Sequence, residues 1–318
     1  KRQLYLFPRG DDFDNVRLYQ RWDESRNLYT QAWDYGSGDM SFQNPYWIMN
    51  KMINQTKKRR YMLSANLKYD VTDWLDVTGR VKVDNADMDI TEKRYAGTDT
   101  NFAGEKGMYS IIKRNDRQIY ADAIANIDLT FAGDYHLSAN VGASLKDVRM
   151  DFMGWGGDLR KIPNFFSITN ISTTNYKERE DGSHIQSQSI FANVELAWKS
   201  MLYLTVTGRN DWESALAFSK YKSFFYPSVG LSAVVSEMVD MPEWFSFLKV
   251  RGSYSAVGSS YAAYLTKPYY DYKGQTHEWD SLHRFPNENL KPEKTKSWEV
   301  GLNARFFGGK LNFDATWY

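Results

Sequence analysis

The chain has 318 residues, of which 42% are hydrophobic and 16% aromatic, yet its mean hydropathy of -0.60 is that of a polar protein. Its 40 Lys and Arg against 39 Asp and Glu give a net charge of +1, so composition provides no electrostatic case for nucleic-acid binding, and zero cysteines exclude a disulfide framework or a Cys-ligated zinc site. No window approaches the roughly 18 apolar residues of a transmembrane helix, which leaves the β-barrel as the other structure able to span a bilayer.

The combination of many aromatic residues with a polar average is unusual for a soluble core. In an outer-membrane barrel only one residue in two faces lipid, so an aromatic outer surface and a wet interior give both values together. The chain opens on Lys1-Arg2-Gln3 without a visible secretory signal, as expected for a mature barrel or an internal portion of one.

Residues 1–60 come first and mix tryptophan, charge and glycine without sustained periodicity. We expect a long loop region with short strands at 4–7 and 17–22. The basic run at 57–60 directly precedes the first clear strand, at its outer end. It could neutralise lipopolysaccharide phosphates at the barrel rim, or it could be an ordinary solvated charge run.

Residues 61–71 alternate, with apolar side chains at the odd positions and, except for Met62, polar ones between them. This period of two predicts a strand, and a turn at 72–73 followed by renewed alternation to residue 84 predicts a hairpin. Four further hairpins follow in the same way, for about ten strands in all: 119–131 with 135–145, 189–198 with 202–208, 225–235 with 248–256, and 298–306 with 311–317.

The connections between these strands alternate between short and long. A strand of about 11 residues tilted near 45° spans about 25 Å of hydrocarbon, and outer-membrane barrels have short periplasmic turns and long extracellular loops. We therefore predict an all-β, antiparallel transmembrane β-barrel segment in the bacterial outer membrane. Its wall occupies residues 61–318, with residues 1–60 extracellular. The predicted extracellular loops lie near 85–117, 147–187, 209–223 and 257–295.

Aromatic residues gather beside the short turns, where an aromatic belt would meet the membrane interface, although ordinary packing at hairpin ends gives the same pattern. The charged residues on the polar side of the strands should face the lumen, where they keep the interior wet and could contact a plug domain, or merely pair with one another. These lumen-facing residues are Lys68, Arg80, Lys82, Asp122, Asp128, Lys249, Arg251 and Glu299.

Exposed aromatic and polar residues in the long loops are the candidates for substrate binding, because sugar rings stack on aromatic side chains and hydrogen-bond to amides and carboxylates. Each could equally serve loop packing. The candidates are Trp155, Asn210, Asp211, Trp212, Trp279 and Asp280.

Catalytic, metal and cofactor sites find no support in the sequence. The four histidines, at 136, 184, 277 and 283, match no zinc motif, and the glycine-rich stretch at 154–158 lacks the Lys-Ser/Thr of a phosphate-binding loop. No Gly-x-Ser-x-Gly elbow occurs. We therefore expect no enzyme activity, no metal and no cofactor.

Several stretches resemble the SusC/RagA family of TonB-dependent outer-membrane transporters. They include NPYW at 44–47 and the Asp73-Trp74-Leu75 turn, TGRNDWES at 207–214, FYPSVGLS at 225–232 and LKVRGSY at 248–254. The most specific is NENLKPEKTKSWEVG at 287–301, which is similar to a hallmark of TonB-dependent receptors generally.

The resemblance implies energy-dependent import of a nutrient oligosaccharide or peptide through a plugged barrel of about 22 strands. It also implies a SusD-like surface lipoprotein, the TonB complex and membrane lipid as partners. No plug or TonB box is visible, so we expect this chain to supply part of the barrel. An outer-membrane enzyme and a structural or adhesive barrel remain as alternatives, and an enzyme would need a lumenal Ser-His-Asp set around His136.

Overall fold

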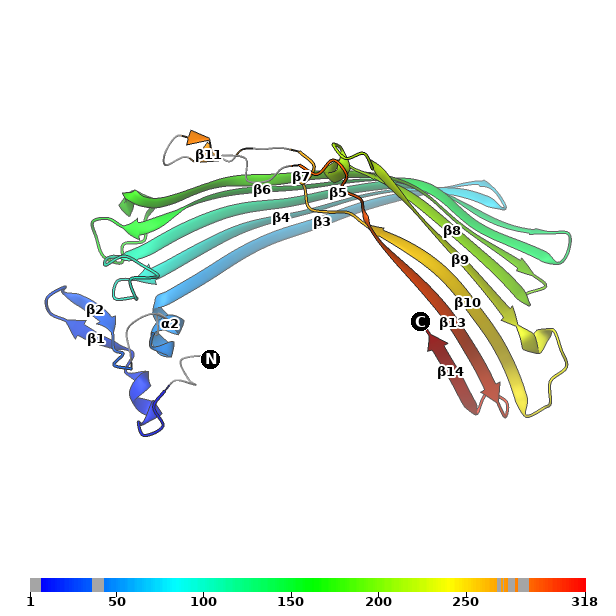
Figure 1. The fold of residues 1–318 in the computed structure, drawn as a ribbon, viewed down its shortest axis with the longest axis horizontal. Coiled ribbons are helices and arrows are strands. Elements are labelled where there is room, and N and C mark those ends of the chain that lie inside the picture. The colour runs from blue at the N-terminus through cyan, green and yellow to red at the C-terminus, as the bar shows by residue number, and fades with distance from the viewer. Residues whose placement is uncertain (1–6, 36–42, 268–269, 271, 274–277, 280–285) are drawn as a thin grey trace. The chain divides into compact units, whose positions relative to one another are not determined.

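The computed structural model describes residues 7–35, 43–267, 270, 272–273, 278–279 and 286–318. Among them, ten strands form one sheet in the order β14-β13-β10-β9-β8-β7-β6-β5-β4-β3 (Figure 1). Strands that follow one another along this part of the chain are therefore neighbours in the sheet, which confirms the predicted antiparallel barrel wall. None of the described helices has the length and apolar content needed to cross a bilayer.

The strands of this sheet are long. Their bounds are β3 (Met52–Thr72), β4 (Leu75–Tyr95), β5 (Gly107–Phe131), β6 (Tyr135–Leu159), β7 (Ile171–Trp198), β8 (Leu202–Glu213), β9 (Ser223–Val234), β10 (Phe245–Ser259), β13 (Glu293–Phe306) and β14 (Leu311–Trp317). Two short hairpins lie outside it, β1 (Gln20–Asp23) with β2 (Leu28–Gln31) and β11 (Tyr272–Lys273) with β12 (Glu278–Trp279).

Several strands continue into segments that the sequence pattern assigned to loops. β4 ends at residue 95 and β5 begins at 107, so the connection is 96–106 rather than 85–117; likewise β6 and β7 are joined by 160–170 rather than 147–187. β8 and β9 extend into 209–223, and β10 and β13 into 257–295. The basic run 57–60 lies inside β3 instead of before it, and the short strand expected at 17–22 is β1 at 20–23. Most of the strand expected at 4–7 lies outside the described residues.

The tight turns suit the twist of antiparallel strands. Lys199 and Ser200, between β7 and β8, have φ of 50° and 55°, and the amide of Met201 donates to the carbonyl of Trp198 at 2.9 Å. Two successive positive φ angles are the mark of a type I′ turn, whose twist matches that of the strands it joins. Beyond this turn the strands pair in the register in which Trp198 faces Leu202, with three residues between them.

The register gives the sheet two chemically different faces. One row across five strands consists of Val194, Val206, Val229, Tyr254 and Trp298. We call the side that carries this row the apolar face. Large side chains on it are exposed, including Val206 at 41%.

The neighbouring row, one residue along each strand, is Glu195, Thr205, Gly230, Ser253 and Glu299. We call the side that carries it the polar face. The Thr205 hydroxyl donates to Glu195 at 3.2 Å there. Alternation of successive side chains between the two sides of a strand produces this division.

The contacts divide the chain into two compact units. The first contains the described residues of Lys1–Tyr61 together with Asn85–Asp116 and Met150–Gly182, and the second contains Met62–Asp84, Arg117–Arg149 and the described residues of Ser183–Tyr318. In the first unit, the 3-10 helix η1 (Phe13–Arg17) and helix α2 (Pro45–Lys51) are held by Asn44. The Asn44 side chain caps α2 by accepting from Tyr46 N at 2.8 Å, and it donates to the carbonyls of Val16 at 2.8 Å and Ala32 at 3.0 Å.

Candidate functional site

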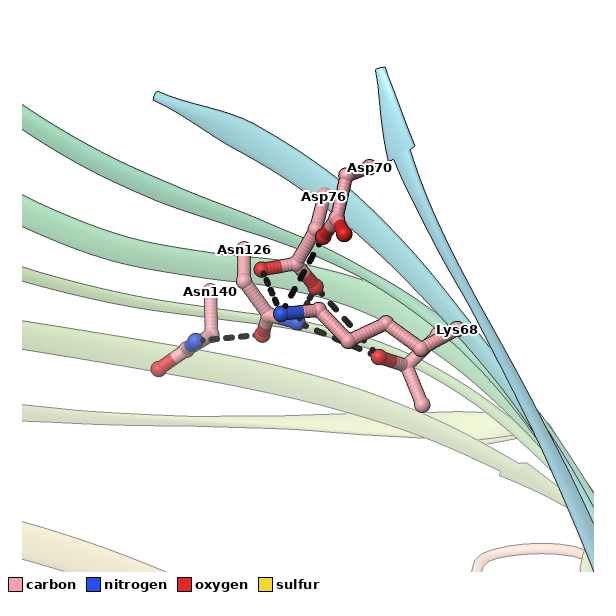
Figure 2. Close-up of polar contacts among 6 residues, drawn as sticks. Lys68, Asp70, Asp76, Asn126 and Asn140 are labelled. Atoms are coloured by element: carbon pink, nitrogen blue, oxygen red, sulfur yellow. Dashed lines mark hydrogen bonds and ion pairs between the residues drawn. The ribbon is translucent and has the colours of Figure 1, made fainter. Parts of the chain in front are cut away.

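A chain of polar contacts crosses four strands on the polar face of the second unit. The Lys68 ammonium on β3 lies 3.2 Å from Asp70 and 3.3 Å from Asp76 on β4. Asn126 on β5 donates to Asp76 at 2.6 Å and accepts from Asn140 on β6 at 2.8 Å. Figure 2 shows Lys68 between the two carboxylates, with Asn126 linking Asp76 to Asn140. Polar side chains of β3 to β6 are thus joined to one another by ion pairs and hydrogen bonds across the sheet.

Asp122 of β5 is a buried charge on this face. Arg80 of β4 binds it in a bidentate manner, with Nε to Oδ1 at 2.9 Å and Nη2 to Oδ2 at 2.8 Å. The Asp122 side chain is 0% exposed, whereas the Arg80 side chain is 41% exposed. Bidentate, charge-assisted contacts of this kind are the strong ones, and a buried carboxylate requires its partner.

A second arginine cluster connects β7, β8 and β9. Arg209 donates from Nε to Asp211 at 2.7 Å and from Nη2 to the Ser189 hydroxyl at 2.8 Å. The Tyr226 hydroxyl donates to the other oxygen of Asp211. The Arg209 guanidinium also lies 5.5 Å from the centre of the Phe191 ring. These contacts occupy both carboxylate oxygens of Asp211.

A third arginine cluster lies on β10, β13 and β14. Arg251 donates from Nη2 to Asp314 at 3.0 Å and to the Thr316 hydroxyl at 2.6 Å, and its Nε lies 3.9 Å from Glu299. Asn303 donates to the same carboxylate of Asp314 at 2.8 Å. As in the Arg80 cluster, a guanidinium binds a carboxylate of another strand, but here the contact reaches across β13 from β10 to β14.

The remaining predicted lumen-facing residues lie on the same face. Lys249 has its Nζ 5.6 Å from the centre of the Tyr203 ring, and Lys82 is exposed two residues beyond Arg80 on β4. Asp128 lies 3.7 Å from His136 Nε2, and both side chains are exposed. The eight predicted residues therefore share one face, where they belong to several clusters and not to one pocket.

The predicted substrate-binding residues are not brought together by the structure. On β8, Asn210 faces Ile190 and Trp212 faces Gln188, on the side that carries the apolar row, whereas Asp211 between them lies on the polar face. Asp211 is only 7% exposed, so its carboxylate is a structural partner of Arg209 and Tyr226.

The other three candidates lie in different elements. Trp155, on β6 in the first unit, stacks on Tyr176 with ring centres 5.0 Å apart and packs against a small core formed by Tyr109, Leu159 and Ile171. Trp279 of β12 is 70% exposed, with its ring centre 5.1 Å from that of Tyr272. Asp280 lies outside the described residues.

Sequence reasoning missed several members of these clusters, above all Asp76, Asn126, Arg209, Tyr226 and Asp314. Arg209 and Asp211 are two residues apart in a strand, so the sequence did contain a signal that they share a side. The partners from other strands depend on register. Within the described residues, no group of three or more His, Asp or Glu side chains is arranged to hold a metal ion.

Over residues 3–318 the chain matches the family model described as TonB dependent receptor-like, beta-barrel. It is 25% identical over 311 residues to the TonB-dependent receptor P26 of Formosa agariphila, covering 92% of this chain and 31% of that protein. It is 23% identical over 286 residues to the TonB-dependent receptor P3 of the same organism, covering 86% and 28% respectively. The chain thus spans about a third of the length of the curated relatives it matches.

Among solved structures, the chain resembles the RagAB peptide transporter, with 17% sequence identity and a TM-score of 0.74 over 89% of this chain and 32% of that chain. This likeness concerns the fold, and it agrees with the ten-stranded sheet and its two faces. Together with the family match over residues 3–318, it shows that this chain belongs to the TonB-dependent receptor β-barrel family.

Proposed function

We propose that this chain forms part of the wall of a SusC-like transporter, which imports a nutrient oligosaccharide or peptide across the bacterial outer membrane in a TonB-dependent process. The single observation that carries the proposal is the division of the sheet into an apolar and a polar face. An apolar face suits lipid, and a polar face suits a water-filled lumen through which a hydrophilic solute passes.

The clusters on the polar face support a lumen rather than a dry core. Arg80, Arg209 and Arg251 each bind a carboxylate on this face, and their side chains remain 41%, 38% and 34% exposed. Water that reaches a partly exposed ion pair lowers the cost of keeping charge on that face. A structural barrel sealed by its own side chains would favour apolar or fully buried contacts there.

The proposed partners follow from the transporter function. A plug domain would lie against the polar face, and Lys68, Arg80, Lys82, Asp122, Asp128, Lys249, Arg251 and Glu299 are the proposed lumen- and plug-facing residues. A SusD-like surface lipoprotein would cover the extracellular side, and the TonB complex would supply energy. Formosa agariphila relatives named as TonB-dependent receptors and the fold of the RagAB peptide transporter support this assignment.

Uptake measurements on the intact gene test the proposal. A deletion strain should lose uptake of at least one oligosaccharide or peptide class, the wild-type gene should restore it, and collapse of the proton-motive force should abolish the restored uptake. A deletion strain that takes up every tested nutrient at the wild-type rate would overturn the transport function. Restored uptake that survives the uncoupler would instead contradict TonB dependence.

The enzyme alternative rests on His136. In the structure the Thr130 hydroxyl lies 3.2 Å from His136 Nδ1, but the Asp128 carboxylate lies 3.7 Å from Nε2, longer than a hydrogen bond. Both contacts come from β5, the strand next to that of His136, where backbone amides are committed to the sheet and cannot readily stabilise an oxyanion. Hydrolysis of lipid or ester substrates should therefore be the same for the wild-type protein and for His136→Ala.

A further inference from the structure

A small hollow lies on the polar face where β8, β9, β10 and β13 are neighbours in the sheet. We call it the wall niche. Its volume is about 120 Å³, which at roughly 30 Å³ per molecule would hold about four waters. Leu231 and Gly252 also border it, but their Cβ positions belong to the apolar face, so they contribute backbone atoms. The side chains that line the wall niche are all polar: Thr205, Ser232, Arg251, Ser253 and Glu299.

Gly230 of β9 forms the floor of the wall niche. It lies in one row of the sheet between Thr205 of β8 and Ser253 of β10. A Cβ atom at this position would be 3.8 Å from the Cβ atom of Ser253 and 3.9 Å from that of Thr205, which are ordinary contact distances. Packing of the sheet therefore does not require a glycine at position 230. The missing side chain leaves the open volume.

Arg251 forms one wall of the niche because the neighbouring strand has no side chain beneath it. Arg251 faces Gly301 of β13, and a Cβ atom at Gly301 would lie 2.8 Å from Arg251 Cζ. The guanidinium passes over this glycine and donates from Nη2 to Asp314 at 3.0 Å and to the Thr316 hydroxyl at 2.6 Å. These contacts fix the direction in which the Nε–H group points.

Hydrogen-bonding groups of the wall niche are left without partners. Arg251 Nε lies 3.9 Å from Glu299 Oε1, which is too far for a hydrogen bond. Within the part of the chain that the structure describes, neither the Ser232 hydroxyl nor the Ser253 hydroxyl is hydrogen-bonded. A donor and an acceptor separated by 3.9 Å leave room for one atom that accepts from Nε and donates to the carboxylate.

This gap selects the chemistry of its occupant. A hydroxyl group both accepts and donates at one oxygen atom, whereas an ammonium group only donates and an ionised carboxylate only accepts. Arg251 also repels an ammonium group from the gap, and Glu299 repels a carboxylate. The wall niche has no aliphatic or aromatic side chain that could contact an apolar side chain of a peptide. A neutral ligand with several adjacent hydroxyl groups satisfies all of these conditions.

We infer that the wall niche is a binding site for one sugar residue of the oligosaccharide that passes through the lumen. One hydroxyl of the sugar bridges Arg251 Nε and Glu299, and an adjacent hydroxyl bonds to Ser253 or Ser232. Gly301 is a positioning residue that acts through Arg251. The inference rests on the proposed function, because it requires the polar face to line a lumen, and it assigns that lumen a neutral sugar instead of a peptide.

Calorimetric binding to the full-length transporter in detergent tests the inference, with a neutral oligosaccharide whose uptake the deletion strain loses as the probe. Gly230→Ala places a methyl group inside the wall niche and should weaken binding about tenfold, without lowering the midpoint of guanidinium unfolding. Gly252→Ala is the matched control, because its Cβ atom would lie on the apolar face, 3.8 Å from the carbonyl oxygen of Glu299. It should bind the probe as tightly as the wild type.

Two polar substitutions test the assigned contacts. Glu299→Gln keeps an acceptor but loses the charge-assisted hydrogen bond and should weaken binding about tenfold, and Ser253→Ala should weaken it about fivefold. Wild-type affinity in Gly230→Ala, or equal losses in the two glycine variants, would overturn the site. A deletion strain that loses only peptide uptake would overturn the sugar assignment while transport stands, whereas one that loses no uptake would overturn the proposed function as well.

Discussion

Replacement of Arg80 should destabilise the barrel more than replacement of its partner. Arg80→Met leaves the Asp122 carboxylate, which is 0% exposed, without its bidentate partner. Removing one member of a buried ion pair costs about 3–5 kcal/mol, and because Arg80 itself is 41% exposed we expect a value near the lower end, about 3 kcal/mol. Asp122→Asn retains an acceptor for Arg80, whose charge water can reach, and should cost only about 1 kcal/mol.

The double variant Arg80→Met/Asp122→Leu removes both charges and should recover to within about 1 kcal/mol of the wild-type stability. The assay is guanidinium unfolding of the full-length protein in detergent, followed by tryptophan fluorescence, with midpoints compared at a common slope. The reasoning is refuted if Arg80→Met lies within about 0.5 kcal/mol of the wild type, or if the two substitutions add instead of compensating.

Three more substitutions test the assignment of faces and the construction of the first unit. Leu204→Arg on the apolar face should cost about 2–4 kcal/mol in a bilayer, while Thr205→Arg on the polar face should cost almost nothing; equal unfolding midpoints in lipid vesicles would contradict the assigned faces. Asn44→Ala removes one acceptor and two donors of a buried side chain, so about 2 kcal/mol should be lost locally and limited proteolysis should cut residues 7–43 faster than in the wild type. Gly97→Ala should also accelerate that cleavage, because Gly97 has φ of 93° and a Cβ atom would lie 2.7 Å from the Cα atom of Thr30; unchanged cleavage would show that the backbone adapts.

Sequence alternation predicted the strands wherever the two sides of a strand meet different surroundings. Residues 61–71 within β3 and 202–208 within β8 are examples. In β8 the apolar side is the more exposed one, whereas residues 61–71 of β3 are exposed on both sides. The signal disappears where both sides are polar. Asn115 on β5 donates to Asn85 at 3.2 Å and to Asp87 at 2.6 Å on β4, on the side that carries the apolar residues of β4 from 75 to 83. The strand continues there, but a period of two in hydropathy does not.

The sequence could predict those features of the candidate site that depend on the alternation within a single strand, but not those that depend on contacts between strands. The eight charges predicted to face the lumen share one face of the sheet, because alternation alone places them on one side. Their partners were not found, because two contacts depend on the register of the strands. Asp314 reaches Arg251 across β13, and Ser189 reaches Arg209 on the next strand, only in one register. The candidates Asn210, Asp211 and Trp212 were grouped by proximity in sequence, although successive residues of a strand point to opposite sides.

β4 to β7 continue beyond the alternating segments into stretches that are polar on both sides, and these stretches determine how the height of the wall can vary. Where both sides of a strand are polar, hydropathy no longer specifies the pairing, and side-chain contacts such as that of Asn115 with Asp87 hold the register instead. Inserting two residues into each strand of the β6–β7 hairpin keeps every side chain on its own side, whereas inserting one exchanges the sides of all residues beyond it. The ends of these hairpins can thus lengthen or shorten in steps of two residues per strand while the rest of the wall keeps its two faces.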